Sequence, residues 1–135
     1  MALITWTNDF SVGVEEIDNQ HKRLVNMINE LHDAMKQGKG NEHVEDIIIR
    51  LVDYSKYHFN TEEKYFHQFS YPDKESHIQT HVDFIDKVSI FAEKFKNNEV
   101  MLTIDVLTFL SDWLRNHIMG IDMDYSDFFI ENGLR

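Results

Sequence analysis

Cysteine is absent from this chain of 135 residues, and proline and glycine are scarce, with one and five residues. Without cysteine, disulfides, thiolate metal sites, cysteine-ligated clusters and cysteine nucleophiles are all excluded, so nothing requires an oxidising compartment and a cytoplasmic location is expected. The few glycine and proline residues are clustered with polar residues between long periodic stretches. This distribution of glycine and proline is typical of an all-helical chain.

Long apolar runs and positive charge are also lacking. No stretch reaches the length of a membrane span, and the N-terminus has no basic segment followed by an apolar core, so neither membrane insertion nor targeting is expected. Only 13 Lys and Arg stand against 24 Asp and Glu, a net charge of -11. This charge argues against nucleic acid and anionic lipid as partners and favours a soluble monomer. The length fits a single domain, residues 1–135.

Apolar residues at helical spacing predict four long helices. They run from about Asp18 to Gln37, from an N-cap at Asn41 to just before Tyr71, from near Pro72 to just before Asn97, and from about Leu102 to Met119; a short helix or turn is expected from Tyr125 to Asn132. Short connections force neighbouring helices to be antiparallel, which predicts an all-α, up-down-up-down four-helix bundle over residues 18–132. Residues 1–17 are expected to form an extended N-terminal arm on the bundle.

Histidine is what the chain has in abundance, with eight residues. In an antiparallel bundle the starts of the first and third helices and the ends of the second and fourth lie at the same end, where we expect His21, His58, Glu62, His77, His81, His117 and Asp122 to meet. Members of the pairs His58/Glu62 and His77/His81 are four residues apart and share a helix face. Asp122 lies five residues after His117, a spacing that places the two side chains on different faces of a regular α-helix. Both point inward only if the helix loosens near Gly120.

A single inward histidine is usually a hydrogen-bonded core residue, and a single acid near a helix end is usually a cap or solvated. Seven such groups in one layer would bury polar atoms at a high cost in free energy, unless a metal is their partner. His32, His43 and His67 fall off this face or far along the axis, so we expect surface or ordinary core roles for them.

The type of metal remains open at this point. Imidazole and carboxylate without thiolate suit iron, zinc, copper or nickel, and seven ligands indicate a dinuclear site. The motif HIQTH has the histidine spacing of the zinc proteases, but Ile78 takes the position of their general base. No Glu is followed by His at the third position, which disfavours the ferritin-like di-iron class.

Four motifs together resemble the hemerythrin family, and its single-domain bacterial members most closely. They are IDNQHKRL, HFNTEEKYF, HIQTH and WLRNHIMGID, preceded by the arm WTNDFSVGVEEID, so the resemblance covers nearly the whole chain. It implies a non-haem centre of two iron ions with an oxo or hydroxo bridge. One iron would be bound by His77, His81 and His117, the other by His21 and His58, and both would be bridged by Glu62 and Asp122. One coordination position then stays open, on the iron with two histidines, where the family binds O2 reversibly.

Four apolar residues adjoin the ligands in the sequence: Phe59, Trp113, Leu114 and Ile118. The resemblance implies that Trp113 and Leu114 help line an O2 pocket, although residues of this kind at helical spacing are usually core. The nearby Tyr54, Tyr57, Tyr65 and Tyr125 are expected mostly to pack with a solvated hydroxyl.

The expected function is O2 storage, transport or delivery without a turnover reaction, and therefore without catalytic residues. The expected partners are O2, an oxygen-consuming enzyme that receives it, and a reductase that restores the reduced site. Two alternatives use the same site: a sensor of O2 or redox state, and a di-iron peroxidase or oxidase. Sustained consumption of substrate would distinguish the enzyme from a carrier.

Overall fold

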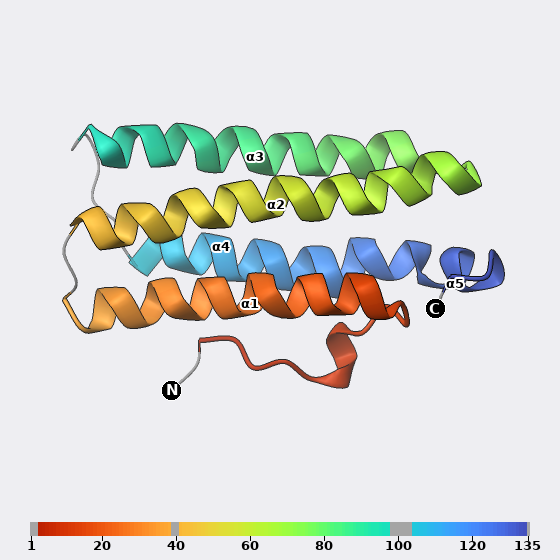
Figure 1. Ribbon diagram of the computed structural model, residues 1–135, viewed down its shortest axis with the longest axis horizontal. Coiled ribbons are helices and arrows are strands. Elements are labelled where there is room, and N and C mark those ends of the chain that lie inside the picture. Colours follow the sequence, from red (N-terminus) through yellow and green to blue (C-terminus); the bar gives the residue numbers. More distant parts are fainter. Residues whose placement is uncertain (1–2, 39–40, 98–103, 135) are drawn as a thin grey trace.

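Four long helices lie side by side, with neighbours running in opposite directions (Figure 1). The computed structural model describes residues 3–38, 41–97 and 104–134. The elements are η1 (Asn8–Phe10), α1 (Glu15–Lys36), α2 (Asn41–Phe69), α3 (Lys74–Lys96), α4 (Ile104–Asn116), η2 (His117–Asp122) and α5 (Met123–Glu131). The expected all-α four-helix bundle is therefore confirmed.

The apolar stripes of the helices form two separate clusters of buried residues. The larger fills most of the bundle and includes Leu24, Leu51 and Ile118, whereas the smaller lies at one end and includes Ile17 and Phe66. Full burial of such a side chain contributes about 1.5–3 kcal/mol. Both α1 and α2 contribute to both clusters. The part of the bundle that lies between the two clusters is therefore covered by apolar side chains on either side.

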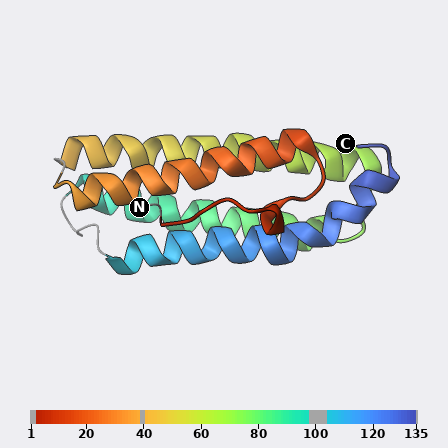
Figure 2. The same cartoon turned by 90° about the horizontal axis from the view of Figure 1, so that it is seen from below.

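The expected N-terminal arm is present and lies along the bundle. From the start of α1 it runs back between α1 and α4 (Figure 2). The Asn29 side chain on α1 accepts a hydrogen bond from the Ile4 backbone N–H at 2.9 Å and donates one to the Ile4 carbonyl at 2.8 Å. The Ser126 hydroxyl on α5 donates to the Val12 carbonyl at 2.6 Å. The arm is thus fastened at both of its ends.

Helix α1 begins at Glu15, three residues before the predicted start at Asp18. Asp18 lies inside the first turn, where its carboxylate accepts hydrogen bonds from the Ser11 hydroxyl at 2.6 Å and the Val12 backbone N–H at 2.8 Å. Glu15, Glu16 and Asp18 all lie in this turn, where negative charge interacts favourably with the helix dipole. Asp18 therefore joins the helix to the arm.

The other predicted helix limits also shift by small amounts. Asn41 is the first residue of α2, although we expected it to be the N-cap. Ser70 adopts a left-handed φ of 56°, and the Tyr71 N–H donates to the Phe66 carbonyl at 2.9 Å, which ends α2. Pro72 lies in the turn that follows, so α3 begins at Lys74. The expected fourth-helix start at Leu102 lies outside the described residues.

Helix α4 passes directly into α5 through the wider π-helical turn η2. Gly120 lies within this turn, so the predicted loosening of the helix is confirmed. Helix α5 begins two residues before the expected Tyr125 and ends one before Asn132. No helix among the described residues combines the length and the apolar character needed to cross a membrane.

Candidate metal centre

All seven predicted polar residues meet toward one end of the bundle. This is the end at which α1 and α3 begin and α2 and α4 finish (Figure 1). They are His21 on α1, His58 and Glu62 on α2, His77 and His81 on α3, and His117 and Asp122 on η2. Each is buried, and both carboxylate side chains are 0% exposed. The layer that they form lies between the two apolar clusters.

Three of the histidines form one group around the carboxylates. Nε2 of His77 and Nε2 of His117 lie 2.9 and 3.0 Å from Oδ1 of Asp122. Nε2 of His81 is 3.2 Å from Nε2 of His117 and 3.9 Å from Oε1 of Glu62. The three imidazoles therefore direct the same ring nitrogen at one point.

The other two histidines form a second group on the same carboxylates. Nε2 of His21 lies 3.1 Å from Oδ2 of Asp122, and Nε2 of His58 lies 2.6 Å from Oε1 of Glu62. Within each group the possible ligand atoms all lie within 4.8 Å of one another, and Glu62 and Asp122 belong to both groups. Three histidines and two histidines thus share two carboxylates.

A chain of hydrogen bonds determines which nitrogen of His58 carries the proton. The Thr61 hydroxyl donates to the Tyr57 carbonyl at 3.2 Å, so its oxygen accepts from the Gln20 amide nitrogen at 3.2 Å. Oε1 of Gln20 consequently faces Nδ1 of His58 at 2.7 Å and can only accept. Nδ1 of His58 therefore carries a proton, and Nε2, the ring nitrogen that faces the carboxylates, is the one available to a metal.

His81 is oriented in the same sense by a different partner. Its Nδ1 lies 3.0 Å from Oε2 of Glu63, and because a carboxylate only accepts, this nitrogen carries the proton. The ring of Phe59 stacks on the His81 imidazole at 3.9 Å and 5° between planes. The lone pair on Nε2 is again directed at the centre.

The four predicted pocket residues pack beside the layer. Phe59 stacks on His81, and Trp113 stacks on the His117 imidazole at 4.4 Å and 12°. Leu114 and Ile118 are buried in the larger apolar cluster. Phe59 also comes within 5.7 Å of His58, centroid to centroid, so it contacts imidazoles of both groups.

Burial and charge act in opposite directions on the carboxylates. Burial raises the pKa of Asp122, but His117, His21 and His77 outweigh it and hold the pKa well below its ordinary value. For Glu62, burial and the Asp122 charge raise the pKa, and the imidazoles of His58 and His81 reverse this to a net lowering. Both side chains are therefore carboxylates, which are available as ligands at neutral pH.

The buried polar atoms lack the hydrogen bonds that a protein interior normally provides. Within the described residues, both oxygens of Glu62, both oxygens of Asp122, Nε2 of His21 and Nε2 of His77 have no hydrogen-bond partner of acceptable geometry. These four carboxylate oxygens and two ring nitrogens, gathered in one buried layer, form a set of potential metal ligands. Cations coordinated by imidazole and carboxylate fit this donor set, and a pair of them suits the two groups.

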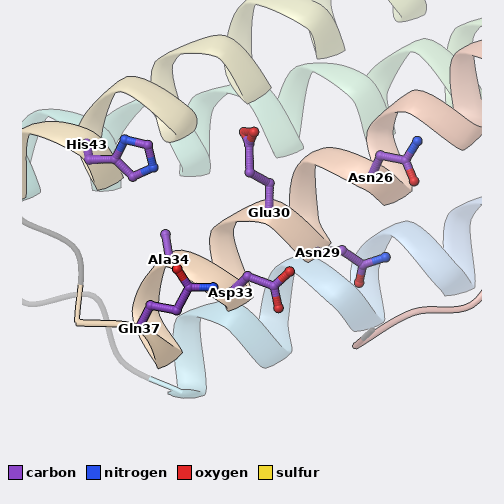
Figure 3. A pocket seen from close by; sticks show the side chains of 7 residues that line it. All are labelled: Asn26, Asn29, Glu30, Asp33, Ala34, Gln37 and His43. Carbon is purple, nitrogen blue, oxygen red and sulfur yellow. The ribbon is translucent and has the colours of Figure 1, made fainter. Parts of the chain in front are cut away.

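The other three histidines stay outside the layer, as the sequence predicts. His43 and His67 are exposed and His32 is half-buried, and none belongs to either group. His43 on α2 lines a cavity of about 330 Å³. The other lining residues, which include Glu30 and Asp33, come from α1 and its C-cap Gln37 (Figure 3). That cavity lies outside both groups of possible ligands.

The sequence reasoning missed three residues behind the imidazoles: Gln20 and Glu63, which contact them, and Thr61, which holds Gln20. Gln20 and Thr61 are polar but buried, and each is next in sequence to a candidate ligand, which is the signal that could have identified them. The expectation for Tyr125 was wrong, because its side chain is 0% exposed and its hydroxyl is buried with no hydrogen-bond partner among the described residues. Burial raises its pKa well above the ordinary value, and Asp122 and Glu62 add to the effect.

Comparisons with known proteins agree with this arrangement. The family model described as the hemerythrin HHE cation binding domain matches residues 12–128. A bacteriohemerythrin of Pseudomonas aeruginosa is 40% identical over 94% of this chain and 82% of its own, and one of Methylococcus capsulatus is 34% identical over 93% and 95%. A crystal structure of wild-type hemerythrin is 32% identical, covers 93% of this chain and 97% of its own, and superposes with a TM-score of 0.89. The chain thus belongs to the hemerythrin family.

Proposed function

We propose that this chain binds O2 reversibly at a non-haem di-iron centre, for oxygen storage, transport or delivery, and that it catalyses no turnover reaction. The observation that carries the proposal is the unequal division of five histidines around two shared carboxylates. A symmetric set of ligands would leave both metal positions alike. The unequal set makes one position poorer in protein ligands, and that position can accept a small ligand.

In this proposal, His77, His81 and His117 hold one iron, and His21 and His58 hold the other. Glu62 and Asp122 would be shared by the two ions, because each belongs to both groups of possible ligands. When bound, the iron pair supplies the electrons and the open coordination position that O2 requires. The open position belongs to the two-histidine side.

The surroundings support reversible binding. The polar layer is closed by an apolar cluster on each side, so water has little access to the ligands. We assign the lining of the O2 pocket to Phe59, Trp113, Leu114 and Ile118, whose side chains offer no strong proton donor beyond the indole N–H. An apolar, water-poor pocket favours release of O2 unchanged over its reduction.

One observation favours an enzyme as the second candidate, either a peroxidase or an oxidase. The Tyr125 phenol is buried, and its hydroxyl has no hydrogen-bond partner in the part of the chain that the structure describes. Its ring centroid is 5.5 Å from that of His77. A neutral phenol near the centre can donate a proton, which promotes cleavage of an O–O bond. A sensor of O2 or redox state would use the same layer.

The proposal also includes the domain organisation, the location and the partners of the protein. Residues 1–135 act as one domain, whose N-terminal arm ends where α1 begins at Glu15, and the protein is a cytoplasmic monomer. It exchanges O2 with an oxygen-consuming enzyme, and a reductase returns an oxidised centre to the reduced state.

The test is anaerobic reduction with iron quantified, followed by optical spectra as O2 is admitted and then removed with argon. Two irons per chain and a visible absorption band that forms in O2 and fades under argon are expected. An irreversible change on the first exposure, or continuing consumption of O2 or peroxide, would transfer the assignment to the enzyme or sensor.

A further inference from the structure

The two groups of histidines differ in the partners behind the imidazoles as well as in number. On the three-histidine side, Nδ1 of His81 donates to the carboxylate of Glu63 at 3.0 Å. On the two-histidine side, Nδ1 of His58 donates to the neutral amide oxygen of Gln20 at 2.7 Å. One imidazole is therefore backed by a negative charge and the other by a dipole.

The surroundings of the two partners match this difference. Gln20 is 6% exposed and is held in place by Thr61. The Glu63 side chain is 25% exposed and lines a surface cavity of about 320 Å³ between α2 and α3, together with Phe59 and Lys56. Burying a carboxylate without a partner costs much free energy, whereas keeping it at an opening to solvent costs little. The charged Glu63 therefore lies at an opening, and the neutral Gln20 is buried.

An imidazole that donates to a carboxylate is a more basic metal ligand than one that donates to an amide. Hydrogen bonds with one ionised partner are also roughly twice as strong as neutral ones. A stronger donor favours the higher charge state of the metal. The stacking of the His81 imidazole on Phe59 also helps to keep Nε2 of His81 directed at the centre.

We propose that Glu63 and Gln20 are positioning residues that make the two metal positions electronically unequal, with Glu63 strengthening His81 on the three-histidine side and Gln20 leaving His58 the weaker donor on the O2-binding side. This inference rests on the proposed di-iron function. It assigns the more basic imidazole to the three-histidine side, and it explains why only one of these two partners lies at an opening to solvent.

The first test compares Glu63→Gln with Glu93→Gln in the iron-loaded protein. Both changes remove one negative charge, and Glu93 is an exposed residue near the other end of α3. For Glu63→Gln we expect Fe2+ affinity at one of the two sites to fall about 10–100-fold, by anaerobic competition with a chelator, and the midpoint potential to rise. Equal potentials and affinities in the two variants would overturn the electronic role.

The second test needs no iron. Long-range proton–nitrogen NMR spectra of the iron-free chain report which ring nitrogen of His81 carries the proton. We expect Nδ1 in the wild type and in Glu63→Gln, whose amide oxygen still accepts, and a shift toward Nε2 in Glu63→Ala. An unchanged tautomer in Glu63→Ala would overturn the positioning role.

The two failures can be told apart. If the wild type binds fewer than two irons or gives no reversible band, the proposed function fails, and the spectra of the iron-free chain still decide whether Glu63 positions His81. If the wild type behaves as a carrier and Glu63→Gln matches Glu93→Gln, only the present inference fails.

Discussion

Nε2 of His117 lies 3.0 Å from Oδ1 of Asp122, although the two residues are five apart in the sequence. In an α-helix a residue five positions later is rotated by about 140° from the first. The π-helical turn η2 removes this mismatch, because its hydrogen bonds join residues five apart and bring them onto one face. A local widening of one helix thus completes both groups of ligands.

Replacement of a proposed ligand should remove iron. His77→Ala takes away one of three imidazoles, so we expect the variant to retain less than half of the wild-type iron after gel filtration and to unfold at a lower temperature. Metal analysis of the purified protein measures this. His67→Ala is the control, since His67 is exposed on α2, and it should keep its full iron content. Full retention in His77→Ala would refute the ligand assignment.

Opening the proposed pocket should speed autoxidation. Leu114→Ala and Leu107→Ala each remove a buried leucine from α4, two turns apart, and each should cost about 2–5 kcal/mol of stability. Only Leu114→Ala is expected to increase the autoxidation rate severalfold, because it admits water beside the centre. The rate is followed by decay of the oxygenated absorption band. Equal rates in both variants would count against Leu114 as a pocket residue.

Metal removal should destabilise the fold, because Glu62 and Asp122 then lose the cations that satisfy their oxygens. A ligand present at one hundred times its Kd stabilises the folded state by about 2.7 kcal/mol, which corresponds to about 10 °C in Tm for a chain of this size. Thermal unfolding of iron-loaded and chelator-treated protein, followed by circular dichroism, measures the difference. Identical curves would mean that no metal occupies the layer.

The buried tyrosines predict a loss of stability at alkaline pH. Burial raises the pKa of Tyr71 to about 12, with Asp73 and Asp124 adding to it, and the pKa of Tyr125 moves the same way. The folded state thus holds these protons more tightly than the unfolded state, whose tyrosine pKa is about 10. Their contribution is complete below about pH 10 and is lost as pH rises toward about 12.

Urea unfolding at several pH values, with tyrosinate absorbance measured in parallel, tests this window. Tyr71→Phe removes one of the two groups and should flatten part of the decline. A free energy of unfolding that stays constant between pH 10 and pH 12 in the wild type would contradict the prediction.

The arm should detach when its polar contact to α1 is removed. Asn29→Ala deletes two hydrogen bonds to Ile4, at a net cost of about 1–3 kcal/mol if each contributes an ordinary amount. We expect faster chymotrypsin cleavage after Trp6 or Phe10. Asn26→Ala, one turn earlier on the exposed side of α1, should leave the cleavage rate unchanged, and equal rates in both variants would show that Asn29 does not hold the arm.

Much of the centre follows from spacing and topology. His58 and Glu62, or His77 and His81, share a face at any position of a regular helix, and the antiparallel order of the helices brings them to one end. Gly120 marked the point where the helix widens. These features depend on local geometry, so a single sequence contains them.

Other features depend on contacts between distant segments. Asp18 became an interior helix residue because its carboxylate meets the arm at Val12. Gln20 and Glu63 acquired their roles through imidazoles on another helix. Tyr125 is buried in the smaller apolar cluster, which includes Val12 and Val14 from the arm. No periodic pattern encodes such pairings, so they became visible only in the structure.

The meeting of all four helices at one layer has a topological consequence. The proposed ligands lie along the chain from the first turns of α1 to the end of η2. When ligands that are far apart in the sequence bind the same ion, they enclose most of the chain in closed loops. While the metal stays bound, each such loop limits how far the chain can open, as a cross-link does. The chain has no cysteine, so bound metal would be its one means of cross-linking itself, and withdrawing the metal would undo every link at once.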